Sequence, residues 1–278
     1  MDKKGQEGSG SIGVGYSVQG EAEQVVTKIH DVCDAKIYWG DSVDQFFCKD
    51  AEFLQKNRAA IEHLQEQLKA DKIVLLNQVH GIEGMIASEH DACEKLWGKE
   101  NISLFEEEGD FIITSEPGVA IGVLTADCVP LVLIAQSVSL IAVVHAGWRG
   151  SVARIVRHVI NKIDQNYGVS SIDLLCLIGP CARACCYMVG EECYQACQAA
   201  GIDEQFLIKR EQGRVFDLVG FNCSELERAG VPREQIDAHN ALCTICHSQY
   251  CSYRRESHAE LPAGPSRLGG RNPTFVML

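Results

Sequence analysis

Short apolar runs separated by polar turns dominate the middle of the chain. They are rich in β-branched residues and occupy residues 73–76, 110–114, 119–124, 129–135, 139–145 and 172–180. Runs of this length that are apolar at almost every position are typical of strands buried on both faces. The pattern therefore predicts a core of several buried strands.

Longer segments repeat their apolar residues every three or four positions, which is the period of an amphipathic helix. Four helices are predicted, over residues 50–70, 151–168, 191–201 and 217–230. The helix at 151–168 is predicted to begin at about Ser151 and to stop near Gly168. The helix at 217–230 has Asp217 as its expected N-cap and Gly230 as a stop signal.

Strands that alternate with helices predict an α+β (mixed α/β) fold, in which mixed β-sheets are flanked by helices. We predict a single domain over residues 21–278. Residues 1–20 are rich in Gly and Ser and carry few large apolar side chains, which predicts a mobile N-terminus. The acidic stretch at residues 99–110 is predicted to be a loop inserted at the surface of the domain.

Composition narrows the class of partner. The chain has 278 residues, of which 46% are hydrophobic, and its formal net charge is −13. This charge disfavours nucleic acid and anionic membranes as partners, because both favour clustered Lys and Arg. No apolar run is long enough to span a bilayer, and the first residues lack the apolar region of a signal peptide. We therefore expect a cytoplasmic protein that acts on a small molecule.

The 14 cysteines accompany these cytoplasmic features and lie largely within predicted helices and strands, so most are expected to be reduced thiols. Cys243, Cys246 and His247 match the C-x-x-C-H pattern of c-type haem attachment, which is disfavoured without an export signal. The same three residues together with Cys251 could hold a structural zinc ion. Unligated thiols are the interpretation that we prefer.

Three predicted strands each lead to a good metal ligand, namely His80, Cys128 and His145. If these strands lie side by side, the three side chains converge. Two imidazoles and a thiolate suit zinc, and a set of three protein ligands leaves a fourth position open for water or substrate, as catalytic sites require. The alternative is that each residue merely fills the core, as buried Cys and His often do.

Two polar residues near these ligands have expected roles. Gln78 lies two residues before His80 and should point to the same side of its strand, where it could contact substrate or orient a ligand. Asp127 precedes Cys128 on the same predicted strand and should point to the opposite side, unless the strand ends or bulges there; on the opposite side it could orient a backbone turn.

Arginines provide candidate anion-binding groups in an otherwise acidic chain. Arg149 follows His145 by four residues and lies beside a predicted helix N-terminus, which favours a bound phosphate. Arg254 and Arg255 form a basic doublet with either a surface role or a role at the site.

The chain contains NQVHG, TADCVPL, VVHAGWRG, IGPCARACCY, LCT and YCSYRRE in this order. Over residues 57–267 this series resembles the YfiH-like laccase-domain family, formerly labelled multicopper polyphenol oxidase, which includes FAMIN-like purine nucleoside enzymes. The resemblance implies a CNF/YfiH-like fold and a zinc-dependent site, with copper as the less favoured metal. It implies purine nucleosides and phosphate as the small-molecule partners.

The implied reactions are phosphorolysis of adenosine, inosine, guanosine and methylthioadenosine to the free base and the (methylthio)ribose 1-phosphate, and deamination of adenosine to inosine. The resemblance places the metal ligands on His80, Cys128 and His145. The candidate catalytic residues are Cys128, His145 and Arg149, and the candidate groups for substrate and phosphate are Gln78, Arg149, Arg254 and Arg255.

Other functions are open to test. A four-copper oxidase is disfavoured, because the chain has nine His and no His-x-His pair. An amidase- or deamidase-type hydrolase would use Cys128 as a nucleophile activated by His145. A non-enzymatic zinc scaffold would need a fourth protein ligand, which the motifs do not offer.

Overall fold

The computed structural model describes residues 28–44, 46, 53–87, 102–258 and 269–278. The predicted mobile segment at residues 1–20 lies outside these ranges. So does the domain boundary at residue 21, and the assignment of residues 21–278 to one domain stays a prediction.

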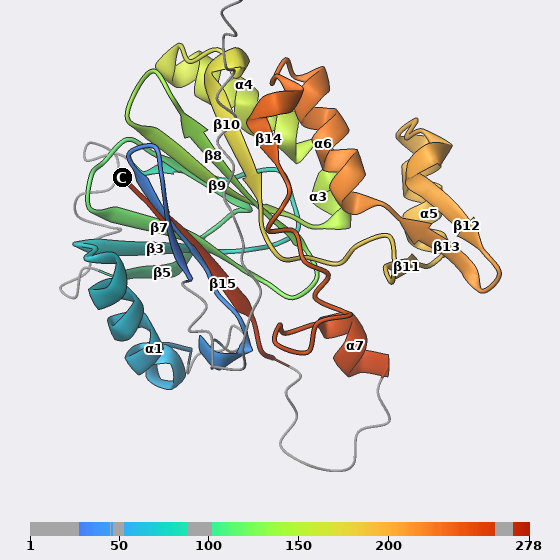
Figure 1. The fold of residues 1–278 in the computed structure, drawn as a ribbon, viewed down its shortest axis with the longest axis horizontal. Coiled ribbons are helices and arrows are strands. Elements are labelled where there is room, and N and C mark those ends of the chain that lie inside the picture. The colour runs from blue at the N-terminus through green and yellow to red at the C-terminus, as the bar shows by residue number, and fades with distance from the viewer. Residues whose placement is uncertain (1–27, 45, 47–52, 88–101, 259–268) are drawn as a thin grey trace, which may run out of the picture.

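Two six-stranded mixed sheets form the centre of the fold (Figure 1). The first has the strand order β1-β2-β15-β7-β3-β5 and the second β14-β10-β8-β9-β6-β4. The strands of the first are β1 (Ile29–Val32), β2 (Ala35–Trp39), β3 (Lys72–Asn77), β5 (Ile102–Glu108), β7 (Val119–Thr125) and β15 (Asn272–Met277). The strands of the second are β4 (Met85–Ala87), β6 (Phe111–Thr114), β8 (Val129–Ala135), β9 (Leu140–Ala146), β10 (Leu174–Ile178) and β14 (Ile236–Asp237).

Helices cover the outer faces of the two sheets. One packs on the first sheet and three pack on the second, and a small three-stranded sheet with a further helix extends to one side (Figure 1). The helices are α1 (Phe53–Leu68), α3 (Trp148–Val152), α4 (Ile155–Tyr167), α5 (Glu191–Ala199), α6 (Leu218–Arg228) and α7 (Tyr253–His258), and the small sheet has β11 (Met188–Val189), β12 (Leu207–Arg210) and β13 (Gly213–Phe216). The predicted mixed α/β architecture is thereby confirmed.

Burial on both faces explains the unbroken apolar runs. Within β9 the odd-numbered residues Ile141 and Val143 pack between the two sheets, whereas the even-numbered residues pack under the helices of the second sheet. Side chains alternate along a strand, so a strand in the middle of such a sandwich needs apolar residues at every position. His145 continues the odd series and therefore projects toward the first sheet.

The predicted surface loop at residues 99–110 is wrong for its described part. Ile102–Glu108 forms β5, which pairs in parallel with β3 at the edge of the first sheet, with Leu75 opposite Leu104. The acidic residues occupy only the end of this strand, where the pairing becomes irregular between Leu75 and Asn77. The Glu residues led to the prediction of a loop, although the residues before them pair with β3 as a strand.

The single helix predicted from Ser151 to Gly168 is also wrong at its start. Helix α3 begins at Trp148 and ends at Val152, and α4 begins at Ile155 after a break. Arg154 adopts a left-handed backbone conformation with φ of 69°, which a helix cannot continue through. The other end is as predicted, because Gly168 ends α4 in a left-handed conformation.

Candidate metal site and cavity

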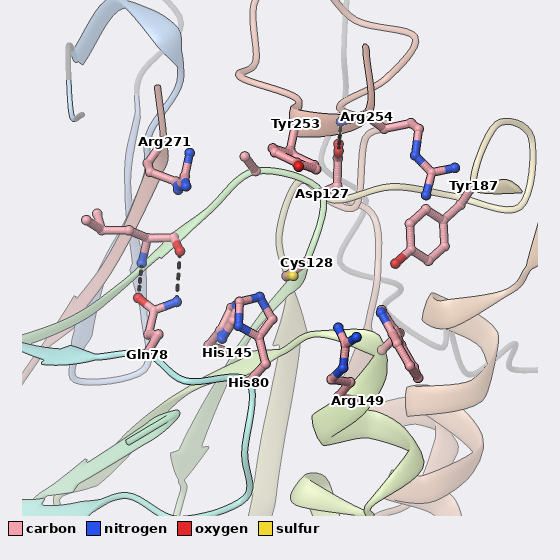
Figure 2. A pocket seen from close by; sticks show the side chains of 13 residues that line it. Gln78, His80, Asp127, Cys128, His145, Arg149, Tyr187, Tyr253, Arg254 and Arg271 are labelled. Atoms are coloured by element: carbon pink, nitrogen blue, oxygen red, sulfur yellow. Dashed lines mark hydrogen bonds between the residues drawn. The ribbon is translucent and has the colours of Figure 1, made fainter. Parts of the chain in front are cut away.

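The three predicted metal ligands meet at one end of the interface between the sheets (Figure 2). The ligand atoms of His80, Cys128 and His145 all lie within 4.8 Å of one another. His80 follows β3 of the first sheet, Cys128 lies in the turn that carries the chain from β7 in the first sheet to β8 in the second, and His145 is in β9. The expected convergence is present, although the strands do not all lie side by side as predicted.

A buried carboxylate, Asp110, organises two of the three ligands. One of its oxygens accepts hydrogen bonds from the His80 backbone N–H (3.0 Å) and from His145 Nδ1 (2.7 Å). The other oxygen accepts from the backbone N–H groups of Gly81 (2.6 Å) and Val79 (3.3 Å). The bond to Nδ1 leaves Nε2 of His145 for the metal, and it fixes the ring orientation, as carboxylates commonly do behind zinc-binding histidines.

The charges of the trio are set by mutual contact. Burial alone would raise the pKa of the Cys128 thiol, but the adjacent imidazoles of His145 and His80 lower it to about 6. Burial opposes protonation of His145, but the Cys128 thiolate and Asp110 raise its pKa to about 9. Burial would likewise raise the pKa of Asp110, whereas its hydrogen bonds to His145 and the backbone hold that pKa below its ordinary value. The opposite directions of these two pKa shifts favour a thiolate–imidazolium pair when no metal is bound.

Gly147 leaves the space that the ligands occupy. A Cβ atom at this position would lie 3.0 Å from Cδ2 of His80 and 3.1 Å from Sγ of Cys128. Both contacts are tighter than ordinary side-chain packing, so a larger residue would press His80 and Cys128 out of place by a few tenths of an ångström. The first Gly of the GWRG motif therefore leaves room for two of the three ligands.

The trio opens into a cavity of about 490 Å³. This volume lies within the range of small-molecule binding sites. The cavity is lined by Gln78, His80, Leu124, Ala126, Asp127, Cys128, His145, Trp148, Arg149, Tyr187, Tyr253, Arg254 and Arg271. The site thus combines candidate metal ligands with aromatic rings and three guanidinium groups.

Gln78 lines this cavity, but its amide also has a structural task. Its Nε2 donates to the carbonyl of Leu124, and its Oε1 accepts from the N–H of the same residue, both at 2.9 Å (Figure 2). These two bonds continue the pairing of β3 with β7 beyond the end of β3. Gln78 therefore fixes the segment that leads to His80.

Arg149 and Arg254 reach the cavity from different elements (Figure 2). Arg149 stacks on Trp148, with 4.2 Å from its guanidinium carbon to the ring centre, and pairs with Glu192 at 2.6 Å. Arg254 lies at the start of α7, and its guanidinium donates to the carbonyl of Met188. Both residues can therefore present positive charge to a bound ligand.

Arg255 is not among the cavity-lining residues. Its guanidinium donates instead to four backbone carbonyls, those of Thr244, Ile245, His247 and Tyr250. Arg255 thereby holds the loop before α7 in shape. Of the predicted arginine doublet, only the first member is at the site.

Asp127 differs from its expected placement, because it is in the turn before β8 and lines the cavity next to Cys128. Its backbone is strained, with φ of 90°. Its carboxylate accepts from the Thr244 hydroxyl at 2.6 Å and from the Arg254 backbone N–H at 2.7 Å. The expected role in orienting the backbone is thus present, and it ties the Cys128 turn to α7.

Five polar or aromatic residues of the site were missed from the sequence: Asp110, Trp148, Tyr187, Tyr253 and Arg271. Asp110 gave a weak signal, as a carboxylate at the start of a fully apolar run. The two tyrosines lie inside the IGPCARACCY and YCSYRRE segments. They were not predicted because they are far along the chain from His80, Cys128 and His145. Arg271 precedes the last strand and carried no signal that we could find.

No helix in the described part of the chain is long and apolar enough to cross a membrane.

Comparison with solved structures supports the fold. YfiH from Bacillus licheniformis superimposes with a TM-score of 0.71, at 21% identity, over 88% of this chain and 92% of that chain. YlmD from Geobacillus stearothermophilus gives a TM-score of 0.70, at 23% identity, over 87% and 90%. The expected YfiH-like fold is confirmed.

Similar curated proteins carry two kinds of name. A "purine nucleoside phosphorylase" from Bacteroides thetaiotaomicron is 37% identical over 149 residues, which are 52% of this chain and 55% of the relative. "Purine nucleoside phosphorylase RC0672" from Rickettsia conorii is 32% identical over 197 residues, 70% of this chain and 75% of the relative. "Adenosine deaminase RL5" from an unknown prokaryotic organism is 35% identical over 150 residues, 52% and 56%. The chain spans little more than half the length of the first and third of these relatives.

The family model described as multi-copper polyphenol oxidoreductase laccase matches residues 42–267, which include every residue of the trio and most of the cavity. This match covers most of the chain and agrees with the YfiH-like fold. The chain belongs to this laccase-domain family.

Proposed function

We propose that the chain is a zinc-dependent purine nucleoside enzyme. It would cleave adenosine, inosine, guanosine and methylthioadenosine with phosphate, releasing the base and the sugar 1-phosphate, and would deaminate adenosine to inosine. The observation that carries the proposal is the metal-ligand trio at the base of a cavity lined by aromatic rings and guanidinium groups. The names of similar proteins, purine nucleoside phosphorylase and adenosine deaminase, support the substrate class.

His80, Cys128 and His145 would hold the zinc ion. The fit is supported by the mutual approach of their ligand atoms, by the Asp110 contact that leaves Nε2 of His145 free to bind, and by the space that Gly147 leaves. When bound, zinc would supply Lewis-acid activation of a water molecule or a substrate oxygen. The trio has no fourth protein ligand among the described residues, which favours a catalytic site over a scaffold.

Phosphorolysis requires an anion held beside the ribose while the glycosidic bond breaks. Arg149 and Arg254 are the groups we assign to this task, since guanidinium groups bind phosphate through two parallel hydrogen bonds. The bond between Arg149 and Glu192 is an exposed ion pair, with 51% and 74% of the side chains accessible, and such pairs are worth at most about 1 kcal/mol. Phosphate could therefore displace Glu192 from Arg149.

The purine ring would stack on the aromatic wall formed by Trp148, Tyr187 and Tyr253. Burial raises the pKa of Tyr187, so its phenol stays protonated and can donate a hydrogen bond to a ring nitrogen or to a ribose oxygen. Protonation of the leaving purine at nitrogen would help bond cleavage, because it removes negative charge from the base.

A second function is favoured by one observation. Asp110, His145 and Cys128 form a carboxylate–imidazole–thiolate series like that of cysteine hydrolases. In the metal-free protein Cys128 could act as a nucleophile toward an amide, which is the amidase- or deamidase-type alternative. Metal occupancy discriminates the two, since a thiolate bound to zinc is a poor nucleophile.

Copper oxidase chemistry, which the family description names, has less support. The trio offers two imidazoles, and the other group of potential metal ligands in the described part of the chain consists of cysteines alone. A four-copper oxidase requires many more histidines around its ions.

The test is chromatography of the products formed from adenosine by the zinc-replete protein, with and without phosphate. We expect inosine without phosphate, and with phosphate adenine, ribose 1-phosphate and inosine together with hypoxanthine, the base released from inosine. His80→Ala should abolish all products. His63→Ala changes a histidine outside the cavity and should leave the products and their amounts unchanged. Adenosine left intact by the wild-type protein would refute the proposal, and activity toward amides that survives removal of zinc would establish the hydrolase instead.

A further inference from the structure

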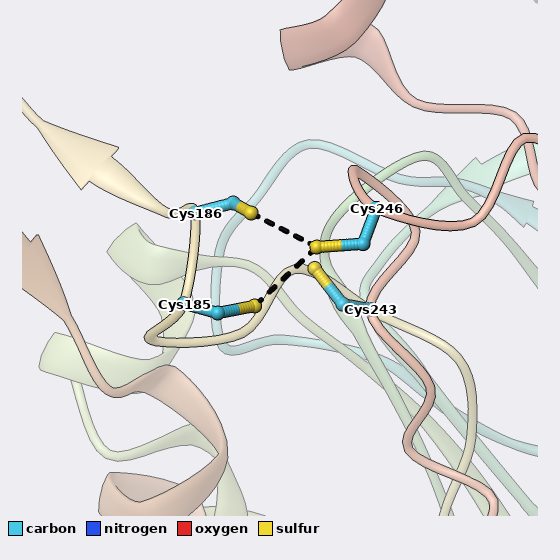
Figure 3. A group of neighbouring side chains, drawn as sticks. All are labelled: Cys185, Cys186, Cys243 and Cys246. Carbon is cyan, nitrogen blue, oxygen red and sulfur yellow. Dashed lines mark hydrogen bonds between the residues drawn. The ribbon is translucent and has the colours of Figure 1, made fainter.

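Four cysteines from two distant loops meet outside the cavity (Figure 3). Cys185 and Cys186 lie in the turn between β10 and β11, and Cys243 and Cys246 lie in the loop before α7. All four sulfur atoms are within 4.8 Å of one another. None of the four lines the cavity, so the cluster is separate from the trio.

The sulfur separations suit a single tetrahedral ion. A zinc ion bound to four thiolates at about 2.3 Å places its sulfur atoms about 3.8 Å apart. The sulfur of Cys246 lies 3.6 Å from that of Cys185 and 3.0 Å from that of Cys186. The other separations are no more than 4.8 Å, so changes of about 1 Å or less in each would produce the tetrahedron. An iron–sulfur cluster would spread the same thiolates around several iron atoms and needs more space.

Backbone contacts hold the two loops in position without help from the sulfurs. Cys181 N–H donates to the carbonyl of Leu242, and Thr244 N–H donates to the carbonyl of Cys181, both at 3.0 Å. Arg183 adds a side-chain bond to the carbonyl of Ala241 at 2.9 Å. The positions of the four cysteines thus follow from the fold.

Local donors also support thiolate ligands. The Cys243 sulfur accepts backbone hydrogen bonds from Cys246 and from Arg183. Such bonds stabilise negative charge on sulfur, and the first of them arises from the C-x-x-C spacing within one tight turn. The segment turns again at His247, whose N–H donates to the carbonyl of Cys243 at 3.0 Å.

We propose that Cys185, Cys186, Cys243 and Cys246 form a second, structural zinc site. Four thiolates complete the tetrahedron and leave no open position, so the ion would take no part in chemistry. The sequence left a structural zinc ion on Cys243, Cys246, His247 and Cys251 as an alternative to the preferred unligated thiols, but His247 and Cys251 are not in the cluster. Cys185 and Cys186 take their places.

The site would brace the wall of the cavity. Cys186 immediately precedes Tyr187, and Cys243 immediately precedes Thr244, whose hydroxyl bonds to Asp127 beside the trio. One ion would therefore link the loop that carries the aromatic wall to the loop that supports the Cys128 turn. This proposal does not depend on which reaction the cavity performs.

Thiol labelling of the wild-type protein tests the site without any substitution. Cys33, Cys185 and Cys246 are all exposed, so an alkylating reagent should reach all three unless a metal holds two of them. We expect the zinc-replete protein to be labelled at Cys33 and protected at Cys185 and Cys246 until a strong chelator is added. Equal labelling of all three before chelation would overturn the proposal. Protection removed only by a reductant would also overturn it, because that result identifies a disulfide.

Metal content gives a second test. Elemental analysis of Cys185→Ser and of Cys246→Ser should show one equivalent of zinc less than the wild type, whereas the matched variant Cys33→Ser should lose none. His80→Ala should keep the zinc of the cysteine site, which separates this proposal from the proposed function. An unchanged zinc content in Cys185→Ser, or iron in place of zinc, would contradict the assignment.

Discussion

Asp110 shows how one residue outside a set of candidate metal ligands can fix their arrangement. It is fully buried, and four donors point at its two oxygens. Burying a carboxylate is costly unless every lone pair is used, so this one is tolerated only because the turn around His80 and the ring of His145 both supply donors. The same bonds that satisfy the charge bring the two ligands to one point.

Asp110→Asn should therefore damage the site although its shape is nearly unchanged. An amide must place its NH₂ group against either the His80 and His145 donors or the Val79 and Gly81 donors, and each choice loses two bonds. We expect zinc affinity to fall by about 10- to 100-fold, the usual effect of removing a carboxylate behind a ligand. Titration with a zinc indicator measures this, and wild-type affinity in the variant would refute the positioning role.

The Cys128–His145 pair predicts how zinc binding depends on pH. Because the pKa of His145 is raised to about 9, zinc must displace one proton from the pair below that pH. Because the pKa of Cys128 is lowered to about 6, zinc must displace a second proton below pH 6. The pair's contribution to zinc affinity should fall about tenfold per pH unit from 9 to 6 and about a hundredfold per unit below 6.

The zinc concentration that gives half-maximal activity, measured in metal buffers across this range, reports the pH dependence for the active site alone. Weaker binding at high pH than at neutral pH, before hydroxide competes for zinc, would contradict the assigned charges. Cys33→Ser is a suitable control, because its thiol is exposed and lies outside the trio.

The trio was predictable from sequence because each ligand stands at the end of an apolar run, where a side chain leaves the core. Asp110 was not predictable, because its role depends on His145, which is 35 residues away along the chain. Tyr187 was not predictable, because its place at the cavity depends on the shape of a loop. Asp127 was misplaced because the sequence does not show that the strand ends at Thr125.

At the scale of elements, the loop before α7 depends on one side chain. Arg255 donates to four backbone carbonyls of this loop, which lies outside the helices and strands, and so takes part of the place of regular secondary structure. A lysine has one ammonium group in place of a planar fork and cannot reach carbonyls spread along a loop.

We expect Arg255→Lys to lower the free energy of unfolding by about 2–3 kcal/mol, the size of one or two lost charge-assisted bonds. Urea denaturation measures the change, with Arg210→Lys on the exposed surface of β12 as the matched control.

The KM for phosphate should rise in Arg149→Lys and stay near the wild-type value in Arg255→Lys. An equal rise in both variants would place Arg255 in the anion site after all.

Elements were predictable where periodicity alone decides them. The strands β3, β6, β7, β8, β9 and β10, the C-terminal end of α4 and the Asp217 N-cap of α6 agree with the pattern. The break before α4 was not predictable, because the apolar stripe runs through it without interruption. It depends on Arg154, whose guanidinium pairs with the buried Glu225 at 2.8 Å and bonds to the carbonyl of Ala200. Those partners come from α6 and from the end of α5.

At the scale of the whole molecule, the site exists because two sheets stack. Its ligands come from both sheets and from the turn that joins them, so their geometry is only as firm as the core between the sheets. Ile121 in β7 is fully buried in that core. Its side chain therefore contributes to the alignment of the sheets without contact with the cavity.

Ile121→Ala should lower the free energy of unfolding by about 2–5 kcal/mol, as expected for a cavity left in a closely packed core. The same substitution at Ile172, which is 61% exposed, should change it by less than about 0.5 kcal/mol. Denaturant unfolding of both variants gives the comparison. Similar small losses in the two would mean that the interface between the sheets is loosely packed.

Inosine and phosphate provide the most direct test of the proposed activity, because inosine cannot be deaminated at the position where adenosine is. The measurement is the release of hypoxanthine by the zinc-replete protein, followed as phosphate is raised from zero. We predict that hypoxanthine and ribose 1-phosphate appear in equal amounts, at a rate that saturates with phosphate and vanishes in His80→Ala. Inosine that remains intact at every phosphate concentration would contradict the account.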